Sequence, residues 1–94
     1  MINLLYKRRS VRKFKDQPVE AEKLEILVQS LLLSPSGKNK RPWHFIIIQD
    51  KEIIKKTAEA KPHGTTPLET APLVIAVAAD TGKSDVWIED SSIA

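Results

Sequence analysis

A run of basic residues near the N-terminus carries the clearest potential for chemistry. Its residues that could hold a ligand are Arg8, Arg9, Ser10 and Arg12. Guanidinium groups match phosphate oxygens with two parallel hydrogen bonds, and a serine hydroxyl adds a further donor. A solvated basic face or a nucleic-acid patch uses the same residue types. The spacing alone therefore leaves three interpretations open: a solvated face, a nucleic-acid patch and a site for a phosphorylated cofactor.

A second candidate is the segment 34–43, which is rich in small residues and carries the basic cluster Lys38, Lys40 and Arg41. Its small residues would let a planar ligand approach the backbone closely. Asn39 carries both a hydrogen-bond donor and an acceptor, so it could bind the edge of a heterocycle. An ordinary connection between a helix and a strand uses the same turn residues, and composition alone favours that simpler interpretation.

Other kinds of reactive site find little support. The chain has no cysteine, which excludes disulfides, a thiol nucleophile and cysteine-ligated zinc. His44 and His63 show no metal-ligand spacing, and we expect structural or surface roles for both. Glu89 and Asp90 are adjacent, so on a helix they point about 100° apart and do not form an acid–base pair. We therefore expect no catalytic side chain and no metal site.

A helix and a buried strand are expected on either side of the segment 34–43. Apolar residues recur between Leu24 and Leu32 with the spacing of a helix that buries one face, which predicts a helix over residues 19–33. The run 43–49 is short, β-branched and aromatic, so it predicts a strand. Because its residues are apolar on both faces, we expect covering layers on both sides, with Trp43 in the core.

The second half of the chain is expected to alternate helix and strand again. Asp50 is placed to cap a helix over 51–60 whose inward residues would be Ile53, Ile54 and Thr57. The other expected elements are a loop over 61–72, a buried strand over 73–79, a turn over 80–83 and a last helix with Val86, Trp87 and Ile88, capped by Ser84 or Asp85.

The composition is that of one small globular unit. Of 94 residues, 41% are hydrophobic and 29% charged, and the net charge of +3 is concentrated in the two basic clusters. No apolar run approaches the roughly 18 residues that span a bilayer, so we expect a soluble, cytoplasmic protein with no membrane partner. Two strands that are apolar on both faces need further layers. We therefore expect the chain to be a fragment or to be completed by a second polypeptide.

Taken together, the two segments resemble the sequence signature of the nitroreductase family of FMN-dependent oxidoreductases. The run 8–14, RRSVRKF, resembles the family's RRSxRxF opening, and the run 35–43, PSGKNKRPW, is similar to its PSxxNxQPW loop. The strand entry at 71–75 and the helix start at 87–90 follow in the family's order. The resemblance spans nearly all of the chain and about the N-terminal half of a typical member. It implies that residues 1–94 are the N-terminal portion of a single nitroreductase-like domain.

The resemblance implies an α+β fold with a mixed, mostly antiparallel sheet flanked by helices. Members assemble as intertwined homodimers, with two FMN sites at the interface and each site built from both subunits. Carried over residue by residue, Arg8 and Ser10 would hold the FMN phosphate and ribityl chain, and Arg12 would reach the N1/O2 edge of the ring. Arg9 belongs to the same motif, but the resemblance assigns it no particular contact with FMN. The other subunit would supply the residues that line the ring, which are Pro35, Ser36 and Asn39.

The implied activity is FMN-dependent oxidoreduction by a ping-pong scheme. NAD(P)H would pass a hydride to flavin N5 and leave, and a small acceptor such as a nitroaromatic or quinone would then take the electrons. Because the flavin carries the hydride chemistry, such an enzyme needs no acid–base constellation, and Arg12 would stabilise negative charge on the reduced ring. The family's glutamine before Pro-Trp is Arg41 here, which leaves the acceptor open.

Two other hypotheses stay open on the sequence. One is a small basic nucleic-acid-binding module that uses 8–15 and 38–41, although no DNA- or RNA-binding signature is present. The other is an inactive fragment of the flavoprotein that folds only through association. A yellow colour that bleaches with NAD(P)H would distinguish the flavoenzyme from both.

Overall fold

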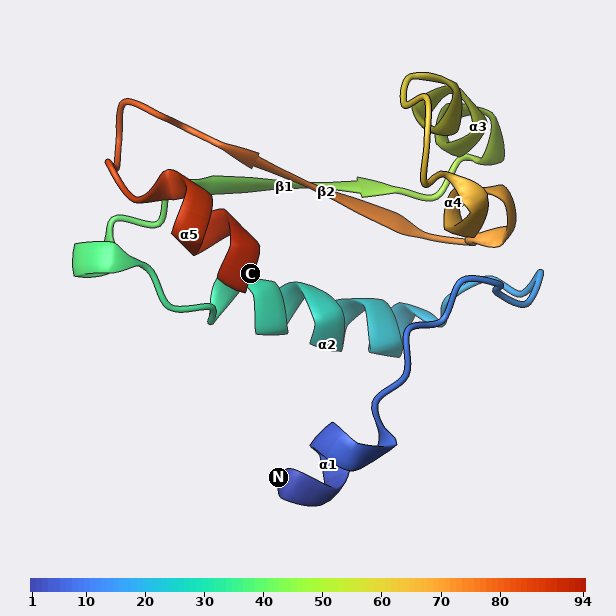
Figure 1. Ribbon diagram of the computed structural model, residues 1–94, viewed down its shortest axis with the longest axis horizontal. Helices are drawn as coiled ribbons and strands as arrows, with labels where there is room; N and C mark the ends of the chain where they lie inside the picture. The colour runs from blue at the N-terminus through green and yellow to red at the C-terminus, as the bar shows by residue number, and fades with distance from the viewer.

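Helices are arranged around a single two-stranded sheet (Figure 1). The computed structural model describes all residues, 1–94. In chain order its elements are α1 (Ile2–Lys7), α2 (Ala21–Leu32), the short 3-10 helix η1 (Gly37–Asn39), β1 (Trp43–Ile48), α3 (Lys51–Glu59), α4 (Thr66–Thr70), β2 (Val74–Ala79) and α5 (Trp87–Ile93). No helix has the length and apolar character that crossing a membrane requires.

The sheet pairs β1 with β2 in antiparallel register, from Trp43 opposite Ala79 to Ile48 opposite Val74. Its residues are β-branched, aromatic or small, which suits a pleated surface. Helices α3 and α4 pack together in the connection between the strands, and α5 packs against both strands. A two-stranded sheet is marginal by itself, so the contact with α5 supports it. This arrangement confirms an α+β fold with an antiparallel sheet.

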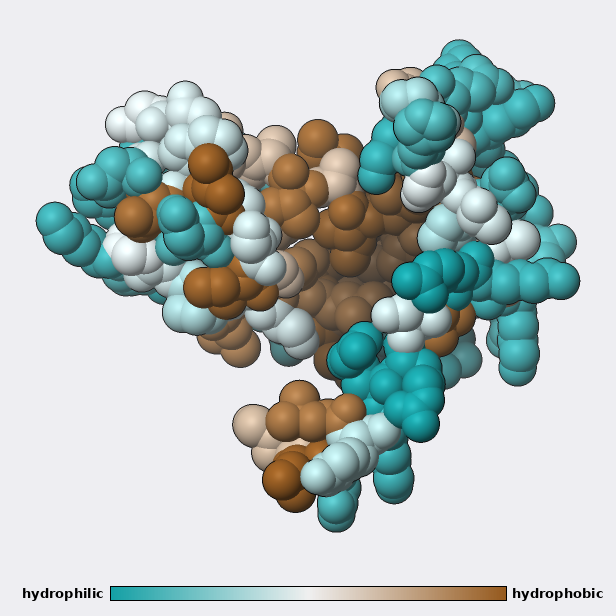
Figure 2. All heavy atoms as spheres, in the orientation of Figure 1, coloured by the Kyte–Doolittle hydropathy of each residue, from teal (hydrophilic) through white to brown (hydrophobic).

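The expectation that both strands are buried on both faces is wrong for these 94 residues. Ile46 is 53% exposed, Ile47 is 38% exposed and Val77 is 41% exposed. Figure 2 shows apolar side chains in the middle of the molecule, over the strands, without a covering layer. The physical reason is that the chain supplies α5 against the strands but no second layer of helices.

The buried core is small. Trp43 is 7% exposed, as expected for a core residue, and its ring stacks on Phe45 with centroids 5.3 Å apart. On α3, Ile54 is 3% exposed and Thr57 is half-buried, but Ile53 is 49% exposed, so its predicted inward position is wrong. Adjacent helix residues point about 100° apart, and a short helix packed on one side cannot bury both isoleucines.

The predicted element order is confirmed with two corrections. The segment 61–72 is not only a loop, because it contains α4, which begins with a proline in its first turn. Proline suits the start of a helix as well as a loop. Helix α1 was not expected. Asp50 caps α3 as predicted, accepting a hydrogen bond of 2.9 Å from the Glu52 amide. Ser84 accepts one of 3.2 Å from the Val86 amide, but the cap position of α5 is Val86 and has no side-chain hydrogen bond, so the predicted cap at Ser84 or Asp85 is wrong.

Candidate functional site

The first group of predicted site residues lies where α1 ends and an irregular segment begins. Residues 8–20 form neither helix nor strand. The backbone turns from helical to extended at Arg8, whose φ and ψ are −58° and 135°. Its Nη1 lies 3.4 Å from the Ser10 hydroxyl. Arg9 instead donates to the backbone carbonyls of Tyr6 and Arg8, at 2.8 and 2.9 Å. Arg8 and Ser10 are thus held close together, while Arg9 folds back on the chain.

No carboxylate neutralises the arginines of this segment. The two ion pairs of the structure join Lys23 to Glu20 at 3.4 Å and Lys51 to Asp16 at 2.9 Å. Arg12 makes no hydrogen bond, and every residue from Met1 to Pro18 is exposed. Exposed guanidinium groups without an acidic partner, next to a hydroxyl, form a donor set that fits a phosphate dianion. The residues present therefore fit the phosphorylated cofactor that the sequence implies.

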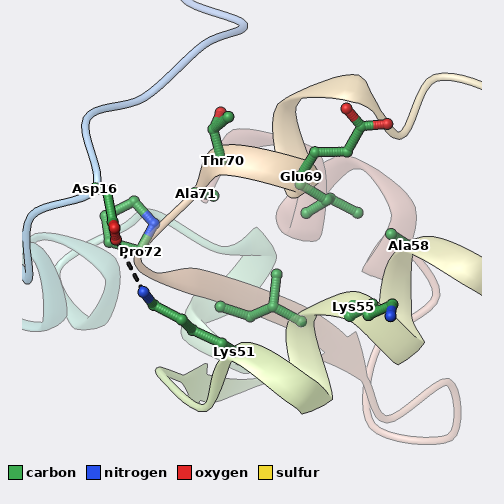
Figure 3. Close-up of a pocket in the computed structure, with 10 residues that line it drawn as sticks. Asp16, Lys51, Lys55, Ala58, Glu69, Thr70, Ala71 and Pro72 are labelled. Carbon is green, nitrogen blue, oxygen red and sulfur yellow. Dashed lines mark hydrogen bonds and ion pairs between the residues drawn. The ribbon is translucent and has the colours of Figure 1, made fainter.

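Contacts farther along the irregular segment tie it to α3 and α4. The Phe14 amide donates to Thr70 Oγ1 at 2.9 Å, and Lys51 Nζ pairs with Asp16 (Figure 3). Beside this ion pair is a pocket of about 540 Å³ lined by α3, α4 and Pro72. None of the predicted site residues lines it. The pocket lies where the irregular segment contacts α3 and α4.

The second group of predicted site residues lies in the connection 34–42 between α2 and β1, which contains η1 and which we name the η1 loop. Ser36 precedes η1, and its hydroxyl accepts a hydrogen bond of 3.0 Å from the Arg41 amide. Arg41 Nε donates to Asn39 Oδ1, also at 3.0 Å. Lys38, Asn39 and Arg41 all have positive φ, at 52°, 55° and 49°. Positive φ is uncommon for residues with a side chain, although asparagine tolerates it, so the loop has an unusual backbone shape held by its own polar contacts.

A residue outside both motifs also contacts the η1 loop. Asp90 on α5 is only 4% exposed, and its Oδ1 accepts a hydrogen bond of 3.0 Å from the Gly37 amide. Sequence reasoning considered Asp90 only as a neighbour of Glu89 and missed this role. No local pattern separates Asp90 from the adjacent Glu89, and its partner is 53 positions away in the sequence.

The two groups of site residues do not meet within one chain. No hydrogen bond or ion pair joins 8–12 to 35–39. Figure 1 shows η1 near the C-terminal end of α2, whereas the irregular segment leads into its N-terminal end. One chain therefore presents two partial binding surfaces.

The histidines do not add to either surface. His44 and His63 are exposed, as expected for surface residues. No group of three or more potential metal ligands comes together in the structure.

Comparison with known proteins gives a match to one family along nearly the whole chain. The model of the Nitroreductase family matches residues 5–92. A solved FMN-dependent nitroreductase from Clostridium difficile R20291 superposes with a TM-score of 0.95 at 48% identity, over 99% of this chain and 54% of that one. A curated Archaeoglobus fulgidus protein, whose name suggests NADH dehydrogenase or NAD(P)H nitroreductase activity, is 37% identical over 97 residues. The match covers 99% of this chain and 55% of that protein.

A more distant relative carries a name that specifies a flavin. The FMN reductase [NAD(P)H] of Bacillus subtilis is 31% identical over 90 residues, covering 96% of this chain and 36% of the relative. The chain spans about half the length, or less, of the curated relatives that it matches. The similarity thus extends along the whole of this chain and stops partway through each relative.

Proposed function

Because the chain belongs to the nitroreductase family, we propose that the protein carrying it is an FMN-dependent oxidoreductase. It passes electrons from NAD(P)H to a small acceptor such as a nitroaromatic or a quinone. The two substrates use the site in turn, in a ping-pong scheme. The named activities of similar proteins, a nitroreductase and an FMN reductase, support this assignment.

The observation that carries the proposal is the pairing of Arg8 with Ser10, in the same exposed segment as Arg12. Arg8 Nη1 lies 3.4 Å from Ser10 Oγ, and none of the three side chains has an acidic partner. Hydrogen bonds from a guanidinium to an ionised acceptor are about twice as strong as neutral ones. We assign the FMN phosphate and ribityl chain to Arg8 and Ser10, and the N1/O2 edge of the ring to Arg12.

The separation of the two surfaces supports assembly as a homodimer. Pro35, Ser36 and Asn39 cannot complete a site with Arg8 in the same chain unless the fold rearranges, because α2 lies between the two groups (Figure 1). A second copy can bring its own η1 loop to the basic segment of the first. In the proposed dimer each FMN lies between the basic segment of one protomer and the η1 loop of its partner.

When bound, FMN supplies the hydride chemistry, and the protein binds and orients it. The chain's own residues then have three tasks. Arg8 and Ser10 hold the anionic end, Arg12 places positive charge beside the ring, and the Asn39 amide group faces it from the other protomer. None of these tasks needs a proton-transferring side chain, because the flavin carries the hydride.

The test uses the longest polypeptide that the gene encodes, purified without added flavin. We expect a yellow protein whose released chromophore co-elutes with FMN in chromatography and whose visible absorption bleaches anaerobically with NADH or NADPH. Size-exclusion chromatography with light scattering should give the mass of a dimer. Addition of a quinone or a nitroaromatic should restore the colour.

Two results would contradict the proposal. A folded protein that stays colourless after incubation with excess FMN has no flavin site. A colourless protein that binds nucleic acid with a steep salt dependence would favour the alternative use of the basic segment.

A further inference from the structure

Asp90 is a charged side chain in an unusual position. It lies on α5 and is only 4% exposed. One carboxylate oxygen accepts the Gly37 amide at 3.0 Å, while the other oxygen, Oδ2, is buried without a hydrogen-bond partner. Burial of a carboxylate is costly unless hydrogen bonds compensate for the lost water. The Gly37 amide is the one hydrogen-bond donor to this side chain. The buried carboxylate therefore holds the backbone of the loop at Gly37.

The contact between α5 and the η1 loop is also close in steric terms. A Cβ atom built on Gly37 would lie 2.6 Å from Val86 Cγ2 and 4.0 Å from Asp90 Oδ1. The first distance is far below van der Waals contact, so a side chain at position 37 would push the loop away from α5. Glycine at this position permits the approach that the hydrogen bond requires.

The loop held in this way has a strained backbone. Three of its residues other than glycine, Lys38, Asn39 and Arg41, have positive φ. Such conformations persist only where the surroundings determine them, and they occur often at ligand sites. The bonds from Arg41 to Ser36 and Asn39 lie within the loop. The Ser34 hydroxyl joins the start of the loop to Ser30 of α2, and the hydrogen bond of Asp90 fastens Gly37 to α5.

We propose that Asp90 is a positioning residue of the flavin site. By holding the Gly37 amide, it fixes the loop so that Ser36 and Asn39 face the ring of the flavin. Asp90 itself does not touch the cofactor. This inference rests on the proposed FMN function and assigns a task to a residue outside both sequence motifs.

The first test compares substitutions at Asp90 in the complete protein. Asp90→Asn keeps an oxygen that accepts the Gly37 amide, whereas Asp90→Leu has a similar shape and no acceptor. Glu89→Leu is the matched control, because Glu89 is the exposed neighbour on the same helix. The readouts are the Kd for FMN, measured by quenching of flavin fluorescence, and the visible circular dichroism of the bound flavin, which reports the surroundings of the ring.

We expect Asp90→Leu to weaken FMN binding about tenfold, the effect of losing one hydrogen bond to a charged acceptor. Its flavin circular dichroism should change as well. Asp90→Asn should bind within about threefold of the wild type, which corresponds to less than half of that free energy. Glu89→Leu should leave both readouts unchanged. If Asp90→Leu folds with the wild-type Kd and flavin spectrum, the positioning role is wrong.

A second pair of variants decides the matter if Asp90→Leu does not fold. Gly37→Ala introduces the Cβ that clashes with Val86, and Val86→Ala removes the Cγ2 atom that it meets. We expect Gly37→Ala alone to weaken FMN binding and to alter the flavin spectrum, and the double variant to restore both. Unchanged binding by Gly37→Ala would show that the loop's fastening to α5 is irrelevant to the site.

The two proposals fail in different ways. If the wild-type protein takes up no FMN, the proposed function is wrong and the inference falls with it. If the wild type binds FMN and the variants at positions 90 and 37 bind it equally well with the same spectrum, only the positioning role is wrong.

Discussion

Arg41 and Asn39 are joined by a hydrogen bond of 3.0 Å from Arg41 Nε to Asn39 Oδ1. The bond determines which part of the Asn39 amide remains available. Its oxygen already accepts one hydrogen bond within the loop, whereas the NH₂ group makes none and is free to donate to a ligand. Arg41 stands where the family pattern has glutamine, and the structure shows that the replacement takes part in shaping the loop.

The free donor of Asn39 can be removed without disturbing its bond to Arg41. Asn39→Asp keeps an oxygen for Arg41 Nε and replaces the NH₂ group by a second acceptor. We expect FMN to bind about tenfold more weakly, because one donor is lost and the ring then faces a negative charge. The Kd from flavin fluorescence measures the effect. Gln29→Glu, an exposed position on α2, adds the same charge and should be neutral. Equal effects of the two variants would contradict an assigned contact at Asn39.

Arg8 is expected to recognise the phosphate rather than the ring. Arg8→Ala should therefore weaken FMN binding by about 10- to 100-fold, the range for a hydrogen bond between charged groups, and leave riboflavin binding nearly unchanged. The measurement is the ratio of the two Kd values. Lys56→Ala removes an exposed positive charge from α3 and serves as the control. If Arg8→Ala weakens FMN and riboflavin equally, Arg8 does not contact the phosphate.

Arg12 is expected to act on the reduction potential of the bound flavin. Its guanidinium has no ionic partner in the chain, so its positive charge can stabilise negative charge that the ring gains on reduction. Arg12→Ala should make the potential more negative by at least about 30 mV, which for two electrons corresponds to a tenfold change in equilibrium. Arg12→Lys, which keeps the charge, should recover most of the shift. An unchanged potential in Arg12→Ala would place this side chain away from the ring.

The sequence predicted most of the fold because the main elements have local signals. Periodic leucines predict α2, the apolar run predicts β1, and Asp50 predicts the start of α3, all confirmed within about two residues. Helix α4 has only five residues, with a proline in its first turn, so its sequence looks like that of a loop. Its Thr70 hydroxyl accepts the Phe14 amide, a contact that no local pattern predicts.

The candidate site was predictable only in part, for a related reason. The two motifs indicate the residues that we assign to the flavin, but their separation across α2 is a property of the tertiary structure. The bond from the Gly37 amide to Asp90 joins positions 53 residues apart. A continuous apolar run also does not distinguish a strand face covered by the same chain from one covered by other residues. For this reason the sequence overestimates the burial of Ile46 and Val77.

The lysines of the η1 loop are expected to attract the nicotinamide cofactor before it binds. Lys38 and Lys40 are exposed and have no ion pair. NAD(P)H is anionic, so this charge should speed its association at low salt and lose its effect as ions screen it. Stopped-flow measurement of flavin reduction should show a rate that falls with ionic strength. In Lys38→Ala/Lys40→Ala the dependence should be weaker, whereas the control Lys55→Ala/Lys56→Ala on α3 should keep the wild-type slope. A flat response in the wild-type protein would contradict this steering.

Two adjacent isoleucines on α3 offer a direct test of how the core is built. Ile54 is 3% exposed and Ile53 is 49% exposed, although the two are adjacent near the start of α3. Ile54→Ala should lower the free energy of unfolding by about 2–4 kcal/mol, because it removes buried methyl groups and leaves a cavity between α3 and α4. Ile53→Ala should change it by less than about 1 kcal/mol, since the side chain is half in water and alanine favours helix. Urea unfolding of the complete protein measures both. Equal losses of unfolding free energy would mean that Ile53 is covered by residues outside this chain. The difference between the two variants therefore reports how far the Ile53 face of α3 stays exposed in the assembled protein.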